Sequence, residues 1–294
     1  MACLEPLAHF LPDRMGSLRP CRMHFGRYLC TVPSAAVLFF AALTVARAAE
    51  PPERIELRYE MFGIVGAHVA TNHTTIEETA DGYAITIDVE SRGIAAVFVN
   101  LTTHSAVVGN LTIDGVRPQT YRGEVRRNGI QTRNGVDYGA GGTEVSEVTS
   151  TIGARPPVAA ALKRGTVDQL TAFFMVERRL ANLGSCALAV AVYDGLRRYD
   201  LYFSDAVLGA APAFAEHNDV GATQGCLMRR QAIAGFLDAS GRSEGAYEGQ
   251  LWYARLLPGD FMIPVQVEFS TEFGKITGHL AELRSRSIHL QFRE

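Results

Sequence analysis

From Glu53 to the end of the chain, apolar and polar residues alternate in short runs. Charged residues separate Ile55, Leu57 and Tyr59, and a period of two is typical of half-buried antiparallel strands. Comparable runs cover 68–77, 83–89, 187–193, 198–203, 225–231, 245–256, 263–270, 276–283 and 288–292. Together with the runs between the turn signals described next, the pattern predicts about 13 strands.

Turn dipeptides separate several of these runs. Asp81-Gly82 follows one run and precedes the next, which predicts a hairpin. Asp114-Gly115, Asn128-Gly129 and Asn134-Gly135 predict three more turns at close spacing. Because strands joined by tight turns pair with their neighbours in sequence, this order favours an antiparallel meander.

One stretch has helical rather than strand periodicity. The run from Thr166 to Gln169 resembles a capping box, and apolar residues then recur at helical spacing, at Leu170, Phe173, Phe174, Val176 and Leu180. We therefore expect a helix that begins at Val167 and ends at Leu180, with its phenylalanine stripe packed on the sheet. Residues 94–100 fit either a second short helix or a bulged strand.

This strand count exceeds that of a simple sandwich. It predicts a mainly β protein with a large, strongly curved antiparallel sheet, either a meander or barrel-like, that closes on itself. The one main helix is expected to plug or flank the concave side. We find no internal repeat and no linker after residue 48, so residues 49–294 are expected to form a single domain.

The first 48 residues have the organisation of an export signal. Arg19, Arg22 and Arg27 precede an apolar run over 34–45, and a small-x-small site follows at Ala46-Arg47-Ala48. Such a run is shorter than the ~20 residues that a membrane-spanning helix needs. We expect Met1–Ala48 to be a signal peptide that directs the protein to the periplasm of a Gram-negative bacterium; the alternative is a buried helix.

The cysteines fit the same location. Three of the five lie before residue 49, which leaves Cys186 and Cys226. In an oxidising compartment the simplest expectation is one disulfide between them. Two separate buried thiols are the alternative, and a redox or metal pair lacks support because no Cys-x-x-Cys motif accompanies them.

The net charge and its distribution after residue 48 exclude nucleic-acid binding as the function. Without residues 1–48 the chain has 23 basic and 29 acidic residues, a formal charge of −6. The arginine pairs are interleaved with acids instead of forming one basic footprint. No later stretch is long and apolar enough to span a membrane as a helix.

A set of short motifs carries a resemblance to a known family. They are Tyr59, Gly66, Asp114-Gly115-x-x-Pro118, Val167-Asp168-Gln169-Leu170, Asp194-Gly195-x-Arg197-Arg198-Tyr199-Asp200, and Trp252 before Pro264. In these residues the chain resembles the domain of unknown function 3108 family, in its α-proteobacterial form with paired cysteines. The resemblance implies a secreted, β-dominated envelope protein and brings no activity with it.

Five side chains are candidates for ligand binding. Phe173 and Phe174 form the apolar face of the predicted helix. Arg197 and Arg198 fit an anionic ligand, or ion pairs with Asp168 or Asp200. Trp252 and its neighbour Tyr253 point to opposite faces of one strand, so that one is core and the other is a candidate wall of a ligand cavity.

Specific catalytic motifs are absent from the sequence. It contains no Gly-x-Ser-x-Gly, His-Glu-x-x-His, Walker lysine loop or Gly-x-Gly-x-x-Gly. The histidines are scattered, and His68 and His73 have opposite parity on one strand, which does not suit a shared metal. We therefore expect no metal and no cofactor.

These observations predict a non-catalytic periplasmic protein that binds a lipid or another apolar or amphipathic envelope component in its curved sheet. One alternative is a structural or adaptor protein of the envelope that acts through protein contacts. Another is an unrecognised hydrolase of an envelope substrate. Its nearest residue set combines Ser185 or Ser204, His217, and Asp205 or Asp219.

Overall fold

The computed structural model describes residues 52–293 apart from 64–65, 140–144, 148–154, 207–211, 213, 216–217, 219, 260 and 272–273; the predicted signal peptide lies outside them. The strands are β1 Glu53–Phe62, β2 His68–Glu78, β3 Gly82–Ser91, β4 Leu101–Thr112, β5 Gly115–Arg127, β6 Ile130–Tyr138, β7 Val145–Glu147, β8 Leu188–Tyr193, β9 Arg198–Asp205, β10 Thr223–Ala234, β11 Glu248–Ala254, β12 Ile263–Thr271, β13 Gly274–Arg284 and β14 His289–Gln291. The helices are α1 Gly93–Phe98, α2 Ala160–Lys163 and α3 Gln169–Leu183, with one 3₁₀ turn at Arg242–Glu244.

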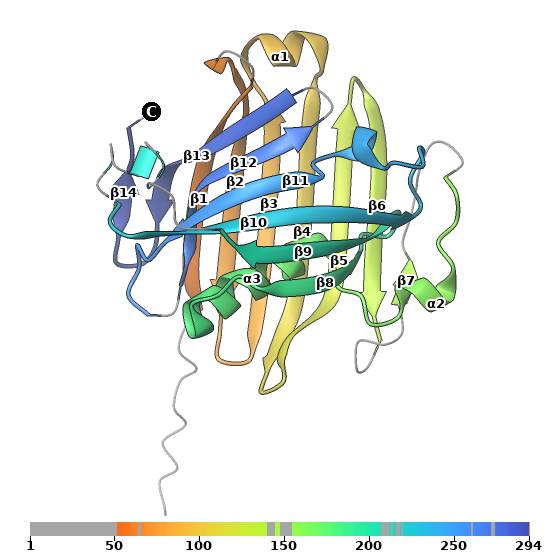
Figure 1. Ribbon diagram of the computed structural model, residues 1–294, viewed down its shortest axis with the longest axis horizontal. Coiled ribbons are helices and arrows are strands. Elements are labelled where there is room, and N and C mark those ends of the chain that lie inside the picture. The colour runs from red at the N-terminus through yellow and green to blue at the C-terminus, as the bar shows by residue number, and fades with distance from the viewer. Residues whose placement is uncertain are drawn as a thin grey trace, which may run out of the picture. The chain divides into compact units, whose positions relative to one another are not determined.

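The described strands form one continuous antiparallel sheet. Its order is β7-β6-β5-β4-β3-β2-β1-β13-β12-β11-β10-β9-β8, and β14 adds to β13. In Figure 1, β8 to β12 cross in front of β2 to β6 at a steep angle, so the sheet folds into two facing layers joined through β1 and β13. The prediction of about 13 antiparallel strands in a curved, barrel-like sheet is confirmed.

Alternation along the strands places the core between the layers. On β1, Ile55, Leu57 and Tyr59 are buried while Arg54, Glu56 and Arg58 are not. Glu60 is also buried, and it pairs with Arg58 and His68. The same rule buries Val190 and Val192 on β8 in the opposite layer. Each layer therefore has one apolar face, and both faces point inward.

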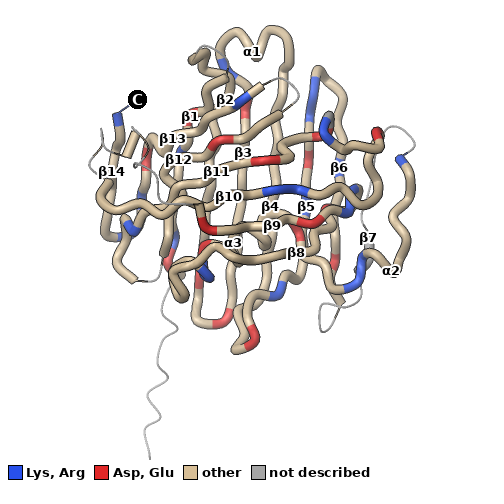
Figure 2. Tube along the Cα trace, in the orientation of Figure 1, with Lys and Arg blue, Asp and Glu red and all other residues tan. Residues whose placement is uncertain are grey.

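Acidic and basic residues occupy the outer faces of the strands. Figure 2 shows the two signs interspersed over the face in view. Many pair between neighbouring strands, as Arg58 of β1 does with Glu282 of β13. This distribution agrees with the absence of a single basic footprint in the sequence.

Helix α3 lies between the two layers, beside β4, β5 and β8. It begins two residues later than predicted, because Asp168 and not Thr166 is its N-cap: the Asp168 carboxylate accepts the backbone N–H of Thr171 at 2.9 Å and its hydroxyl at 2.6 Å. Thr166 instead donates to the carbonyl of Lys163. The helix ends at Leu183, three residues later than predicted, and Gly184, with a φ of 66°, forms its left-handed C-cap.

Asn134-Gly135 lies inside strand β6, so the prediction of a turn there is wrong. The reason is a contact with the hairpin turn between β8 and β9. The Asn134 side-chain amide donates to the carbonyl of Asp194. Gly195 in that turn approaches the Gly135 backbone so closely that an added Cβ would lie 2.7 Å from its carbonyl oxygen. A small residue is therefore needed where β6 meets this turn.

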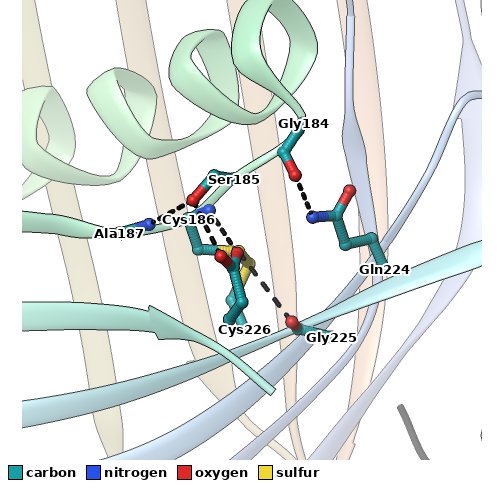
Figure 3. Close-up of a disulfide and its surroundings, with 8 residues drawn as sticks. Gly184, Ser185, Cys186, Ala187, Gln224, Gly225 and Cys226 are labelled. Carbon is teal, nitrogen blue, oxygen red and sulfur yellow. Dashed lines mark hydrogen bonds between the residues drawn. A yellow bond between two sulfur atoms is a disulfide. The ribbon is translucent and has the colours of Figure 1, made fainter. Parts of the chain in front are cut away.

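The predicted disulfide joins Cys186, just after α3, to Cys226 on β10, with their Cα atoms 5.9 Å apart (Figure 3). Asp205 supports the same corner: it accepts the Cys186 backbone N–H at 2.6 Å and the Ser185 hydroxyl at 2.8 Å. Gln224 donates to the carbonyl of Gly184 at 2.7 Å. The C-terminal end of α3 is thus attached to the sheet.

Residues Gly93–Phe98 form helix α1. Of the two structures predicted for residues 94–100, the short helix is therefore confirmed and the bulged strand is not. α1 buries none of its residues, and Ile94, Val97 and Phe98 are 65%, 80% and 74% exposed. The helix lies above the ends of the back-layer strands in Figure 1. Three exposed large apolar side chains on one short helix form an apolar surface feature.

Replacing both cysteines, Cys186→Ser with Cys226→Ser, should lower the free energy of unfolding by about 3–4 kcal/mol, because the bridge closes a loop with a sequence separation of 40. Thermal melting of wild type with and without reductant checks this. An unchanged melting temperature in reductant would contradict the stabilising role of the bridge.

Gly195→Ala should cost roughly 2–4 kcal/mol, since φ is +90° and the new Cβ meets the Gly135 backbone. Gly165→Ala is the matched control: φ is +69° with nothing within 4 Å, so only about 1 kcal/mol of backbone strain applies. Urea unfolding compares the two. Equal losses would show that the contact between β6 and the turn adds nothing.

Candidate functional site

A cavity of about 940 Å³ lies between the two layers. Its walls are the inward-facing side chains of β1 to β5, β9 to β13 and α3. Most of them are apolar, among them Leu57, Ile76, Ile85, Leu201, Leu251 and Val267. The volume is at the upper end of the range for small-molecule sites, and apolar walls with a few polar groups are typical of such sites.

Phe173 and Phe174 both line this cavity. Phe174 stacks on Tyr83, with ring centroids 4.9 Å apart. Phe173 meets Phe203 edge to face at 5.6 Å. Each ring is therefore held by a ring of the sheet, which fixes the helix face that the cavity meets.

Trp252 and Tyr253 point to opposite faces of β11, as the sequence predicts. Tyr253 has no exposed surface and lines the cavity. Trp252 is partly buried and packs against the core outside the cavity lining. Tyr253, not Trp252, is thus the wall residue of this pair, and contact between Trp252 and a ligand stays a prediction.

Arg197 lines the cavity, and the N–H groups of its guanidinium already donate hydrogen bonds within the protein. Its Nε and Nη2 donate to Asp194 Oδ2 at 2.9 and 2.8 Å, and its Nη1 donates to the carbonyl of Glu244 at 2.8 Å. The Asp194 carboxylate raises the pKa of Arg197. These bonds favour an ion pair over an anionic ligand, with Asp194 as partner in place of the predicted Asp168 or Asp200.

Arg198 lies outside the cavity lining. Its Nη1 donates to Asp200 Oδ1 at 2.6 Å and its Nε to the carbonyl of Leu162 at 3.0 Å. The ion-pair alternative with Asp200 is therefore the one observed. Asp168 serves α3 as its N-cap and pairs with neither arginine.

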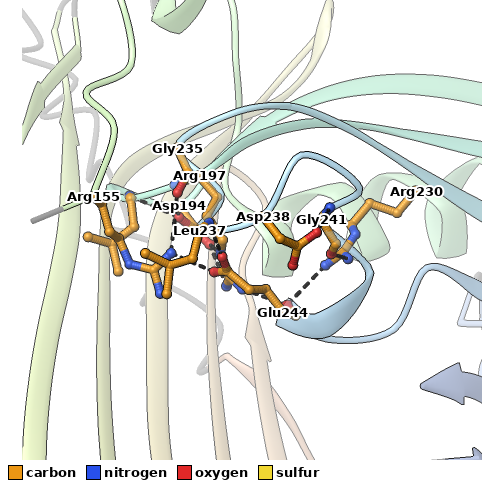
Figure 4. A network of polar contacts seen from close by, with 10 residues as sticks. Arg155, Asp194, Arg197, Arg230, Gly235, Leu237, Asp238, Gly241 and Glu244 are labelled. Carbon is orange, nitrogen blue, oxygen red and sulfur yellow. Dashed lines mark hydrogen bonds and ion pairs between the residues drawn. The ribbon is translucent and has the colours of Figure 1, made fainter. Parts of the chain in front are cut away.

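A polar network closes around Arg197 at the cavity wall (Figure 4). Arg155 pairs with Glu244 at 2.5 Å and donates to the carbonyl of Gly235. Arg230 donates to the carbonyls of Glu244 and Gly241 at 3.1 and 2.5 Å. The network thereby ties the segment from Gly235 to Glu244 to the turn between β8 and β9, to β10 and to the segment before α2.

Glu177 is the group that sequence reasoning missed. It lies on α3, three and four residues after Phe174 and Phe173, and lines the same cavity. Its side chain is partly buried and lines both this cavity and a smaller pocket beside it. It makes no hydrogen bond or ion pair to any other described residue. Burial raises its pKa to about 8. A charged residue on an apolar helical stripe was the available signal.

Two tyrosines lie close to this carboxyl. Glu177 contributes, after burial, to raising the pKa of Tyr59 and of Tyr253. The Tyr59 hydroxyl donates to the carbonyl of Pro264 at 2.8 Å. The Tyr253 hydroxyl is buried without a hydrogen-bond partner among the described residues. Besides the network around Arg197, the cavity therefore has a polar corner formed by α3, β1 and β11.

The residues proposed for a hydrolase are only partly described. Ser185 donates to Asp205, which also holds the Cys186 backbone, so this pair supports the disulfide corner. His217 and Asp219 lie outside the described residues. Within the described part of the chain, no group of three or more His, Cys, Asp or Glu residues is placed to hold a metal ion.

Comparison with known protein families identifies the family of this chain. The model of the family described as protein of unknown function (DUF3108) matches residues 56–281. The chain belongs to this family. The resemblance seen in its motifs is therefore confirmed.

A solved structure is similar to part of the chain. It is a β-barrel-like protein of domain of unknown function DUF1849 from Brucella abortus, with 12% sequence identity and a TM-score of 0.46. The similarity covers 81% of this chain and 99% of that one. No curated protein matches the sequence. In the part of the DUF3108 chain that is described, no helix is long and apolar enough to cross a membrane.

Glu177 should make ligand-free protein less stable as pH rises. Its folded pKa of about 8, and that of Asp168 at about 6, exceed the unfolded values. Their protonated forms favour the folded state, so this stabilisation is complete at about pH 4 and is lost as pH rises toward 8.

Glu177→Gln should remove most of that loss, which leaves the variant more stable than wild type at pH 8 by roughly 1–4 kcal/mol. Urea unfolding at pH 5, 6.5 and 8 measures it. Glu248→Gln, which removes an exposed carboxyl of β11, is the matched control. Parallel profiles for wild type and Glu177→Gln would refute the assignment.

Proposed function

We propose that this protein binds an apolar or amphipathic component of the cell envelope, such as a lipid, in the cavity between its two sheet layers, and does not transform it. The observation that carries the proposal is the cavity itself, about 940 Å³ with mainly apolar walls. Apolar walls without contact atoms forfeit dispersion energy, and an apolar ligand restores those contacts.

Export to the periplasm belongs to the same proposal. It rests on the arginines, the apolar run and the Ala-Arg-Ala site of the first 48 residues. The disulfide between Cys186 and Cys226 supports it, because such bridges persist in oxidising compartments. In that location the available amphipaths are components of the envelope.

A second candidate function is that of an envelope adaptor. The apolar side chains of α1 favour it, since Ile94, Val97 and Phe98 are mostly exposed. Crosslinking in cells from α1 that recovers one defined protein partner, with no lipid bound to the purified protein, would support this reading over the first.

The hydrolase alternative is less well supported. Glu177 has a raised pKa, which suits an acid or base. The described cavity lining contains no histidine or cysteine, so it lacks the base and nucleophile pair of the commonest hydrolases. We therefore propose binding as the function.

Protein isolated from the periplasm without detergent should carry a lipid that mass spectrometry detects after extraction. Thr103→Trp, on a cavity-lining position of β4, should lower its amount roughly tenfold, because the indole occupies ligand volume. Thr102→Trp adds the same ring to an exposed position beside it and should leave the amount unchanged. Consistently empty wild type, or equal loss in both variants, would refute binding in this cavity.

A further inference from the structure

The polar corner at Glu177 gives the cavity a preference among amphipaths. We infer that the cavity takes an amphipath with a primary ammonium group, and that Glu177 on α3 binds this group while the apolar chain lies along the walls of the sheet. This inference rests on the proposed function and specifies its ligand class.

The first argument is the charge balance at Glu177 itself, because the described lining as a whole is basic, with four arginines against two glutamates. Glu244, the other glutamate, pairs with Arg155, and Arg197 pairs with Asp194. Arg178, the nearest base in sequence to Glu177, pairs with Glu78 at 2.7 Å and lies over the ring of Phe174. No described basic side chain pairs with Glu177. Because a buried carboxylate is stable only when paired, Glu177 in its ionised form takes its countercharge from the ligand.

The second argument is the inventory of donors and acceptors. A carboxylate offers only acceptors. Tyr59 gives its proton to the carbonyl of Pro264, so its oxygen has only acceptor capacity left. Tyr253 contributes a single hydroxyl without a partner among the described residues. An ammonium group has three N–H donors and no acceptor, which suits this acceptor-rich corner better than a carbonyl or a carboxylate does.

The third argument is the aromatic wall around the carboxyl. Tyr59 and Tyr253 line the cavity with Glu177, whereas the ring of Phe174 already stacks on Tyr83 and lies under Arg178. Aromatic faces attract cations through their quadrupole, and more strongly where water is excluded. The corner thus combines a carboxylate with aromatic rings, which is the chemistry that recognises an alkylammonium.

Binding should release a proton. The titratable and charged groups that face Glu177 are Tyr59 of β1, Tyr253 of β11, and the Glu78–Arg178 ion pair at a smaller pocket of about 190 Å³ on its other side. With a pKa of about 8, most Glu177 carboxyls are protonated at pH 7 in the empty cavity. An incoming ammonium ionises the carboxyl, whose proton passes to the buffer.

Isothermal titration calorimetry of delipidated full protein with decylammonium, and separately with decanol, tests the inference. Wild type should bind both ligands. Binding of decylammonium should release close to one proton, which is measured as the difference in binding enthalpy between phosphate and Tris buffers. Glu177→Gln should weaken decylammonium by about tenfold or more and abolish the release, while decanol binding stays unchanged. Glu177→Asp should retain part of the preference, and Glu248→Gln should behave as wild type.

The outcomes separate the two proposals. If wild type binds decanol but Glu177→Gln binds decylammonium as tightly as wild type does, or no proton is released, the ammonium assignment is wrong while the cavity function stands. If wild type binds neither ligand, the proposed function fails, and the inference fails with it. Tighter binding of decanoate than of decylammonium by wild type would also overturn the assignment.

Discussion

Pairing of β1 with β13 is the constraint on which the rest of the structure depends. It joins the first strand to one more than 200 residues later, from Glu56 with Arg284 to Phe62 with Thr277. Two meanders that would otherwise be separate become one sheet, and its twist turns their apolar faces toward each other. Tyr59 strengthens the junction through its hydrogen bond to Pro264. Without this pairing there is no enclosed space between the layers.

Helix α3 lies between the two layers and lines the cavity there. Asp168 caps one end of the helix, and the disulfide after its other end attaches it to β10. A helix held at both ends presents Phe173, Phe174 and Glu177 in fixed positions. The sheet thus supplies the apolar volume and the helix supplies its polar corner, a division that suits an amphipathic ligand.

Local patterns predicted the parts of this fold that depend on local sequence. Alternation located the strands, and the Phe173 and Phe174 stripe located α3. Asn134-Gly135 was misassigned because its conformation depends on a contact with Gly195, 60 residues away. The cavity was not predictable in size, because its depth depends on the separation of two layers. Arg197 was ambiguous because its partner Asp194 lies on a turn whose geometry the sequence pattern does not specify. Arg198 pairs with Asp200, two residues along β9, which was one of the two predicted partners.

The most direct test of the account is a high-resolution crystal structure of protein isolated from its native compartment without added lipid or detergent. The account predicts continuous elongated electron density between the β1–β5 and β9–β12 walls, with one end beside Glu177. A cavity filled by repacked side chains such as Phe173 and Tyr253, or occupied only by ordered water, would contradict it.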